Sequence, residues 1–291
     1  MNYDMKIDYQ SLTDGLLKKY DYGIFCQREK KVLVIGIGGG SDIVGAFSIA
    51  SVLHERNPDV EILYGLCVSP KNRYDGFEMI NGSLYQRRDD IQNVSTDHLH
   101  HSPKLLIKMA RFKNDLPNPF LIVRPKKNQD LIEKAFRDVI EELKPDLIYA
   151  IDLGGDSLTG GLDDDDMGFD RSGIRALQKI ARPFIYMVLG PGCDGESECD
   201  KIIDALQSEL SVDSLLGIFE LTKEIEFMSG ISQNLLDKNR TPSIITNAFL
   251  KIKENPDNRE KLVEIERHIH PKIPLQWLIS GVVLDGNKFN G

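Results

Sequence analysis

Three short stretches of the sequence combine several glycines with acidic side chains. They read Gly36-Ile-Gly-Gly-Gly-Ser-Asp42, Asp152-Leu-Gly-Gly-Asp-Ser157 and Gly190-Pro-Gly-Cys-Asp-Gly-Glu196. Glycines lack a Cβ atom, so backbone N–H groups can approach a ligand oxygen, and a following helix N-terminus adds partial positive charge. This combination is typical of phosphate or carboxylate sites. We therefore predict ligand contacts from Gly36, Gly38, Gly39, Gly40, Ser41, Gly154, Gly155, Ser157, Gly190, Gly192, Cys193 and Gly195.

The first stretch departs from the common nucleotide-binding fingerprints. Gly36 and Gly38 fit the dinucleotide pattern G-x-G-x-x-G, but Ser41 stands in place of its third glycine. No Lys-Ser or Lys-Thr pair follows the glycines, so the P-loop pattern fails as well. The strand expected over 60–68 lacks the terminal acid that usually holds ribose hydroxyls. The sequence therefore favours neither NAD nor S-adenosylmethionine.

The acids of these stretches would repel a bound phosphate unless a cation lies between them. Mg²⁺ takes a few carboxylates and lets phosphate oxygens complete its shell, so we predict metal ligands at Asp152, Asp156 and Asp194. Asp42, Asp152 and Glu196 are the candidate catalytic residues, because a carboxylate can transfer a proton and a bound cation can activate water. Alternatively, the acids hold sugar hydroxyls and one of them is a general base.

Each acid also has an ordinary structural role open to it. Asp42 can cap a helix, and Asp152 and Asp156 can cap turns. Asp194 and Glu196 stand where a helix cap and a first-turn acid would stand. The aspartate run over 163–166 fits a solvated loop better than a metal cage.

Cys193 suggests a different chemistry. It lies on a glycine turn between a strand and a helix, as a nucleophile does in an elbow motif, and His268 or His270 would be its base. Pro191 stands where the elbow wants a small residue, so a buried structural cysteine is the preferred interpretation.

The elements that must position these residues alternate between strands and helices. Short apolar runs predict strands over 32–35, 60–68, 120–124, 147–151, 183–189 and 215–221, and periodic stretches predict helices from 42, over 130–144, over 172–181 and over 197–210. Strands separated by helices form a parallel sheet, whose carboxyl ends share one edge. The three glycine–acid stretches should meet there. We expect one α/β domain over 1–291, with a Rossmann-like three-layer fold and a mainly parallel sheet.

Residues 71–118 are the least regular part of the sequence and are expected to form an inserted lid or specificity region. They include His98, His100 and His101, which we interpret as exposed or capping residues rather than as a metal site.

Composition excludes several classes of partner. Hydrophobic residues make up 41% and charged residues 28% of the 291 residues, as in ordinary soluble proteins. A net charge of −9 without a lysine-rich stripe argues against binding to nucleic acid or to an anionic membrane. No signal peptide or transmembrane run is evident, and four cysteines without CxxC spacing suggest neither zinc nor disulfides, so we expect a cytoplasmic protein. The oligomeric state stays open.

The order of the three glycine–acid stretches resembles a bacterial and archaeal family of unknown function, DUF1152, over about residues 30–285. The family commonly carries a fourth glycine at the position of Ser41. The resemblance implies a Rossmann-like fold in which the stretches form one site, and it implies no activity.

These observations lead to three hypotheses. The first is an enzyme, such as a Mg²⁺-dependent hydrolase or transferase, that acts on a phosphorylated or nucleotide-like metabolite. The second is a sensor that binds such an anionic small molecule at the same edge without turnover. The third is acyl transfer through Cys193.

Overall fold

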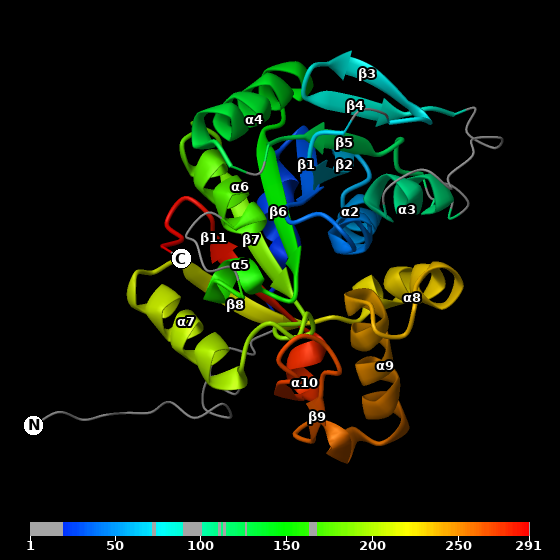
Figure 1. The fold of residues 1–291 in the computed structure, drawn as a ribbon, viewed down its shortest axis with the longest axis vertical. Coiled ribbons are helices and arrows are strands. Elements are labelled where there is room, and N and C mark those ends of the chain that lie inside the picture. Colours follow the sequence, from blue (N-terminus) through cyan, green and yellow to red (C-terminus); the bar gives the residue numbers. More distant parts are fainter. Residues whose placement is uncertain are drawn as a thin grey trace, which may run out of the picture.

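The computed structural model describes residues 20–71, 74–89, 101–109, 112, 115–125, 127–162 and 168–290. Within these residues, a nine-stranded sheet forms the centre of the molecule (Figure 1). Its strands, in spatial order, are β3 (Phe77–Asn81), β4 (Leu84–Arg87), β5 (Phe120–Val123), β2 (Glu61–Val68), β1 (Lys31–Gly36), β6 (Leu147–Leu153), β7 (Phe184–Leu189), β11 (Ser280–Asp285) and β8 (Leu215–Glu220). The strands from β5 to β7 are parallel, and β4 and β11 run antiparallel to their neighbours.

Helices cover both faces of this sheet (Figure 1). One layer contains α2 (Asp42–Arg56), α8 (Lys223–Leu235) and α9 (Thr241–Glu254), with α3 (His101–Met109) against α8. The other contains α4 (Gln129–Leu143) and α6 (Phe169–Gln178), with α5 (Asp156–Thr159) and α7 (Cys199–Ser211) beside them. The remaining elements are η1 (Tyr22–Arg28), η3 (Pro256–Asn258), α10 (Leu275–Leu278) and the antiparallel pair β9 (Leu262–Glu264) and β10 (Lys272–Pro274). The predicted three-layer Rossmann-like fold is confirmed.

The sequence pattern explains these layers. Every residue of β6 and of β7 is buried, as expected for parallel strands that are covered on both faces. Helix α4 buries one apolar stripe that includes Ile132, Phe136 and Val139, and the Asn128 side chain caps it by accepting a hydrogen bond from the Leu131 N–H. In the part of the chain that the structure describes, no helix combines the length and the apolar character needed to cross a bilayer.

The chain between β2 and β5 adds to one edge of the sheet. The hairpin of β3 and β4 pairs with β5, and α3 follows it. The proposed lid function of 71–118 and the single-domain organisation stay predictions. His98 and His100 lie outside the described residues, as does the 163–166 aspartate run, and the side chain of His101 is not among the described ones.

The direction of the chain changes at β1. From β1 the chain continues outward to β2 and β5, and it then returns to the other side of β1 to form β6 and β7. The carboxyl ends of β1 and β6 are therefore the topological switch point, where open α/β sheets bind their ligands. The Ile37 N–H donates to the Ile151 carbonyl over 2.9 Å, so the loops that follow both strands begin side by side.

Candidate metal and anion site

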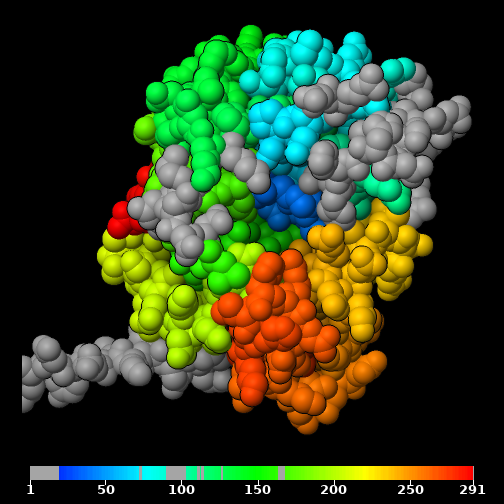
Figure 2. All heavy atoms as spheres, in the orientation of Figure 1, coloured from blue at the N-terminus to red at the C-terminus, as the bar shows by residue number. Residues whose placement is uncertain are grey.

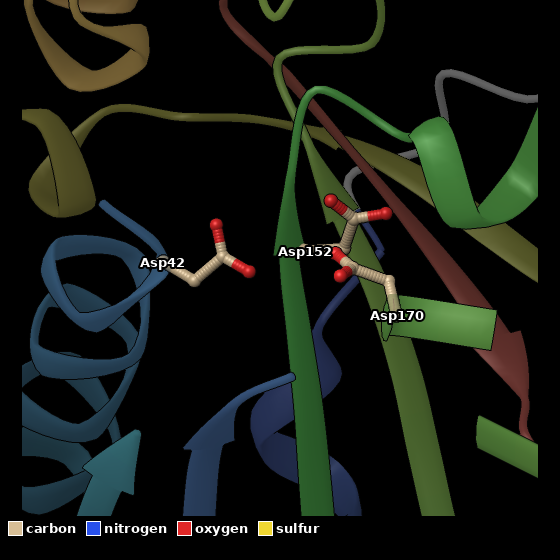
Figure 3. A group of neighbouring side chains, drawn as sticks. All are labelled: Asp42, Asp152 and Asp170. Carbon is tan, nitrogen blue, oxygen red and sulfur yellow. The ribbon is translucent and has the colours of Figure 1, made fainter. Parts of the chain in front are cut away.

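Three aspartates meet at the switch point. Oxygen atoms of Asp42, Asp152 and Asp170 all lie within 4.8 Å of one another, and the three side chains point toward a common space (Figure 3). They come from the start of α2, the end of β6 and the start of α6. Oxygen ligands at this spacing are what Mg²⁺ and similar hard cations bind.

Backbone and side-chain donors fix the first two aspartates. The Gly38 N–H donates to Asp42 Oδ2 over 2.9 Å, and Asp42 is the first residue of α2 rather than its cap. Asp152 Oδ2 accepts hydrogen bonds from the Ser157 hydroxyl and, over 3.2 Å, from the Tyr186 hydroxyl. Both aspartates are buried. The site therefore holds two preorganised carboxylates.

Asp170 is the member that the sequence reasoning missed. We predicted a helix over 172–181, but α6 begins at Phe169, which places Asp170 in its first turn. Helices that follow parallel strands begin at the carboxyl edge of the sheet, so an acid at the start of α6 belongs to the same edge as Asp42. This rule, applied to the acid that precedes the predicted helix, could have identified Asp170 from the sequence.

The cluster is electrostatically costly. Burial raises the pKa of Asp42 well above its usual range, and the neighbouring Asp152 adds to this effect. Burial raises the pKa of Asp152 and, with the charges of Asp152 and Asp42, that of Asp170. Like charges in a desolvated site cannot all ionise cheaply, so binding of a proton or of a cation would stabilise the cluster.

Asp156 and Asp194, both predicted as metal ligands, lie next to this cluster. Burial raises the pKa of Asp156 well above its usual range, and Asp170 contributes the largest charge effect. Asp194 is buried, and its Oδ2 atom has no hydrogen-bond partner among the described residues. Burial raises the pKa of Asp194 to about 7. Asp194 thus supplies a carboxyl group whose protonation changes near neutral pH.

The third predicted catalytic residue, Glu196, is half-buried at the edge of the site. One carboxylate oxygen accepts a hydrogen bond from the Leu162 N–H over 3.4 Å, and the other lies 3.4 Å from His268 Nε2. Its charge contributes to the raised pKa of the half-buried Asp156. Glu196 therefore connects the edge of the site to the C-terminal segment.

The three glycine–acid stretches do meet, as predicted. The Gly192 N–H donates to the Gly154 carbonyl over 2.7 Å, and Asp194 packs so tightly on Gly154 that a Cβ atom there would lie 2.3 Å from Asp194 Oδ2. In Figure 2 the blue segment around the first stretch is exposed at the centre of one face, among green and orange segments.

Most of the predicted ligand-binding glycines serve close packing. Added Cβ atoms would lie within 3 Å of neighbouring atoms at seven of the nine predicted glycines, and six of these seven are buried: Gly36, Gly154, Gly155, Gly190, Gly192 and Gly195. Ser41 is buried as the cap residue of α2, and Ser157 is engaged by Asp152. Gly38, Gly39 and Gly40 differ, because they line a cavity.

This cavity has a volume of about 200 Å³ and lies between the first glycine stretch and the end of β2. Its lining also includes Lys71 and Phe169, and no acid is among the described lining residues. Gly38 therefore lines the cavity and also packs against the carboxylate of Asp170. An anion in the cavity would lie next to a cation in the cluster.

Arg124 is a second residue that the sequence reasoning missed. Its side chain is fully buried, and its guanidinium donates to the carbonyl oxygens of Ile37, over 3.1 Å, and of Phe169. It also donates to the Ser172 hydroxyl over 3.2 Å. Arg124 therefore ties the first glycine stretch to the start of α6 and positions Asp170. Its isolated place after β5 gave no chemical signal in the sequence.

The structure does not support Cys193 as a nucleophile. Cys193 is completely buried, and burial raises the pKa of its thiol well above the usual range, which disfavours the thiolate. The proposed bases are engaged elsewhere, since His268 lies near Glu196 and His270 Nδ1 lies 3.1 Å from Glu264. The preferred interpretation, a structural cysteine, fits this environment.

A comparison with known protein families identifies the family of this chain. The model of a family described as "Protein of unknown function (DUF1152)" matches residues 33–241. The chain belongs to this family. The match contains the three glycine–acid stretches, Arg124 and Asp170, and ends before the segment that carries His268.

Two further comparisons concern individual proteins. No curated protein gave a significant match. Among solved structures, the chain is similar to UDP-GlcNAc 2-epimerase from Neisseria meningitidis bound to UDP-GlcNAc, with 11% sequence identity and a TM-score of 0.33. The alignment covers 78% of this chain and 51% of the epimerase, so the chain spans about half the length of that enzyme. A similarity at this level carries no inference about ligand or reaction.

Proposed function

We propose that this DUF1152 protein is a metal-dependent enzyme, a hydrolase or transferase, that acts on a phosphorylated, nucleotide-like small molecule. The observation that carries the proposal is the placement of the buried Asp42 and Asp152 carboxylates and the half-buried Asp170 carboxylate beside a glycine-lined cavity. A divalent cation would neutralise the carboxylates, and it would be shared with an anion in the cavity.

Each group has a distinct role in this proposal. Asp42, Asp152 and Asp170 would hold Mg²⁺, which would supply Lewis-acid chemistry at the phosphate. This revises the ligand set expected from the sequence, in which Asp156 and Asp194 accompanied Asp152. Asp156 lies next to Asp170 within the site, and in this proposal it has a supporting role rather than that of a metal ligand.

Asp194 is the group we assign to proton transfer. It is buried, one of its oxygens has no partner among the described residues, and its pKa is raised to about 7, near the value at which an acid–base catalyst works best. Glu196 lies farther out, beside His268, and we assign it to positioning the edge of the site.

The direct test is metal binding followed by turnover. Manganese titration followed by electron paramagnetic resonance should give one tight site in the wild type and none in Asp152→Asn. A screen of phosphorylated metabolites with Mg²⁺ should then give a product that Asp194→Asn fails to form while it still binds metal. Binding of a phosphorylated ligand without turnover of any would indicate a sensor, and absence of metal binding would refute the proposal.

A further inference from the structure

The cavity beside the first glycine stretch is lined by more residues than a phosphate group alone would contact. Gly38, Gly39 and Gly40 form one wall, and the end of β2 with the following segment forms another. Beyond the glycines, the described lining contains apolar and aromatic groups, one serine and one cation; these residues are Cys67, Val68, Ser69, Lys71, Tyr74, Pro103 and Phe169. The cavity therefore combines groups that can bind an anion with apolar surface.

The two aromatic side chains that line the cavity, Phe169 and Tyr74, are held in place by contacts with other residues. The Arg124 guanidinium lies 3.6 Å from the centroid of the Phe169 ring, and its hydrogen bond to the Phe169 carbonyl also fixes the backbone. Phe169 is half-buried, so part of the residue stays open and lines the cavity. The Tyr74 hydroxyl donates to the Ser69 carbonyl over 2.8 Å, which fixes the second aromatic side chain. A ring that enters the cavity meets surfaces that lose little freedom on binding.

The charges around the cavity divide by sign. Lys71 is exposed and lines the cavity, and the described lining contains no acid. The carboxylates of Asp42 and Asp170 contact Gly38 but are not among the described lining residues. The end of β2 carries the neutral Ser69 rather than an acid, so it offers no carboxylate to a ribose diol. The ligand is thus recognised at its phosphate and at an apolar ring.

We infer that this cavity is a subsite for a nucleoside monophosphate unit, with the base against Phe169 and the phosphate beside Gly39 and Lys71. This inference deepens the proposed function and rests on its anion site, but it does not require the metal. It distinguishes the substrate class from simple sugar phosphates, which have no aromatic base to stack on an aromatic side chain.

The test compares ligands that differ only in the base. Calorimetric titrations use the four common nucleoside 5′-monophosphates, ribose 5-phosphate and inorganic phosphate, each with and without Mg²⁺. At least one nucleotide should bind about tenfold or more tightly than ribose 5-phosphate, because stacking on an aromatic residue adds that much. Phe169→Leu should remove this advantage and change the ribose 5-phosphate affinity less than about twofold.

Lys71→Met tests the contact between the cavity and the phosphate group. It should weaken nucleotides and ribose 5-phosphate by the same factor, about three- to fivefold, whereas the exposed Lys253 on α9, changed to Met, should leave both unchanged. Nucleotides that bind no better than ribose 5-phosphate, or a Phe169→Leu variant that weakens both equally, would overturn the inference.

A spectroscopic variant covers the case in which Phe169→Leu does not fold. Phe169→Trp adds a tryptophan to a chain whose only other one, Trp277, is buried. Its fluorescence should be quenched by the nucleotide and not by ribose 5-phosphate, and equal responses to both would also overturn the inference. Manganese binding that disappears in Asp152→Asn tests the proposed function independently, so either hypothesis can fail while the other stands.

Discussion

Gly38 packs directly against the carboxylate of Asp170: a Cβ atom at position 38 would lie 1.8 Å from Asp170 Oδ2. The N–H of the same residue donates to Asp42. One glycine therefore sets the position of two of the three clustered carboxylates. Its absence of a side chain, rather than an unusual backbone angle, is what the site requires.

Gly38→Ala should therefore displace Asp170 and abolish metal binding while it leaves the fold intact. We expect the Mg²⁺-dependent rise in Tm to disappear and the Tm without metal to fall by a few degrees at most. Gly82→Ala is the matched control, because a Cβ atom there meets nothing within 4 Å. An alanine at position 38 that preserves the Mg²⁺ response would show that Asp170 is not a metal ligand.

Asp152→Asn should separate stability from metal binding. The substitution removes one charge from a desolvated, mutually repelling group, so we expect a higher Tm than wild type in EDTA. The Mg²⁺-dependent stabilisation, about 3 kcal/mol at a hundredfold excess over Kd for the wild type, should vanish. Both changes are measured by thermal unfolding with and without Mg²⁺.

The control for this variant is an acid outside the site. Asp204 is exposed on α7, so Asp204→Asn should change neither the Tm in EDTA nor the Mg²⁺ response. If the two variants behaved alike, the stabilisation by Mg²⁺ would be a non-specific charge effect.

The metal-free protein should lose stability as the pH rises from about 4 to 7. Burial raises the pKa of Asp194 from 3.8 to about 7, so in this range the native state binds more protons than the unfolded chain. Stability then falls with rising pH, and the cost reaches on the order of 4 kcal/mol above pH 7 for this one group. The pKa values of Asp42, Asp156 and Asp170 are shifted in the same direction and steepen the trend.

Urea unfolding in EDTA across this pH range measures the effect. Asp194→Asn cannot ionise at this position, so its stability should depend less on pH and should exceed that of the wild type at pH 8. Saturating Mg²⁺ should oppose the loss in the wild type, because the cation favours the ionised carboxylates. Metal-free stability that rises from pH 5 to pH 8 would contradict the assignment of raised pKa values.

Arg124→Met should disturb both the fold and the site. The change leaves the carbonyl oxygens of Ile37 and Phe169 without their buried donor, and an unpartnered buried polar group costs about 1–3 kcal/mol. We expect a clearly lower Tm and weaker Mn²⁺ binding, since α6 would no longer hold Asp170 in place. Arg124→Lys should rescue little, because an ammonium does not reproduce the planar set of donors.

The matched control for Arg124 is another arginine with a defined partner. Arg259 forms a two-point contact with Glu220 at a half-exposed position, with both distances 2.9 Å. Arg259→Met should lower the Tm slightly and leave Mn²⁺ binding unchanged. Equal losses of Mn²⁺ affinity in the two variants would argue against a specific positioning role for Arg124.

The parallel strands, several of the helices and the edge at which they meet could be predicted from the amino-acid pattern. The apolar runs of β1 and β6 and the periodicity of α4 predicted these elements because burial imposes a period on the sequence. The convergence of the glycine–acid stretches followed from the geometry of parallel strands.

Packing between distant segments of the chain controls which acids share one space and which glycines line the cavity. Asp170 joined Asp42 and Asp152 because α6 begins earlier than its apolar pattern shows, and Arg124 reached the site from β5 through the interior of the protein. Contacts between residues far apart in the chain produce no recognisable spacing pattern in the sequence. Whether a glycine faces a cavity or a neighbouring side chain depends on packing, which local sequence does not encode.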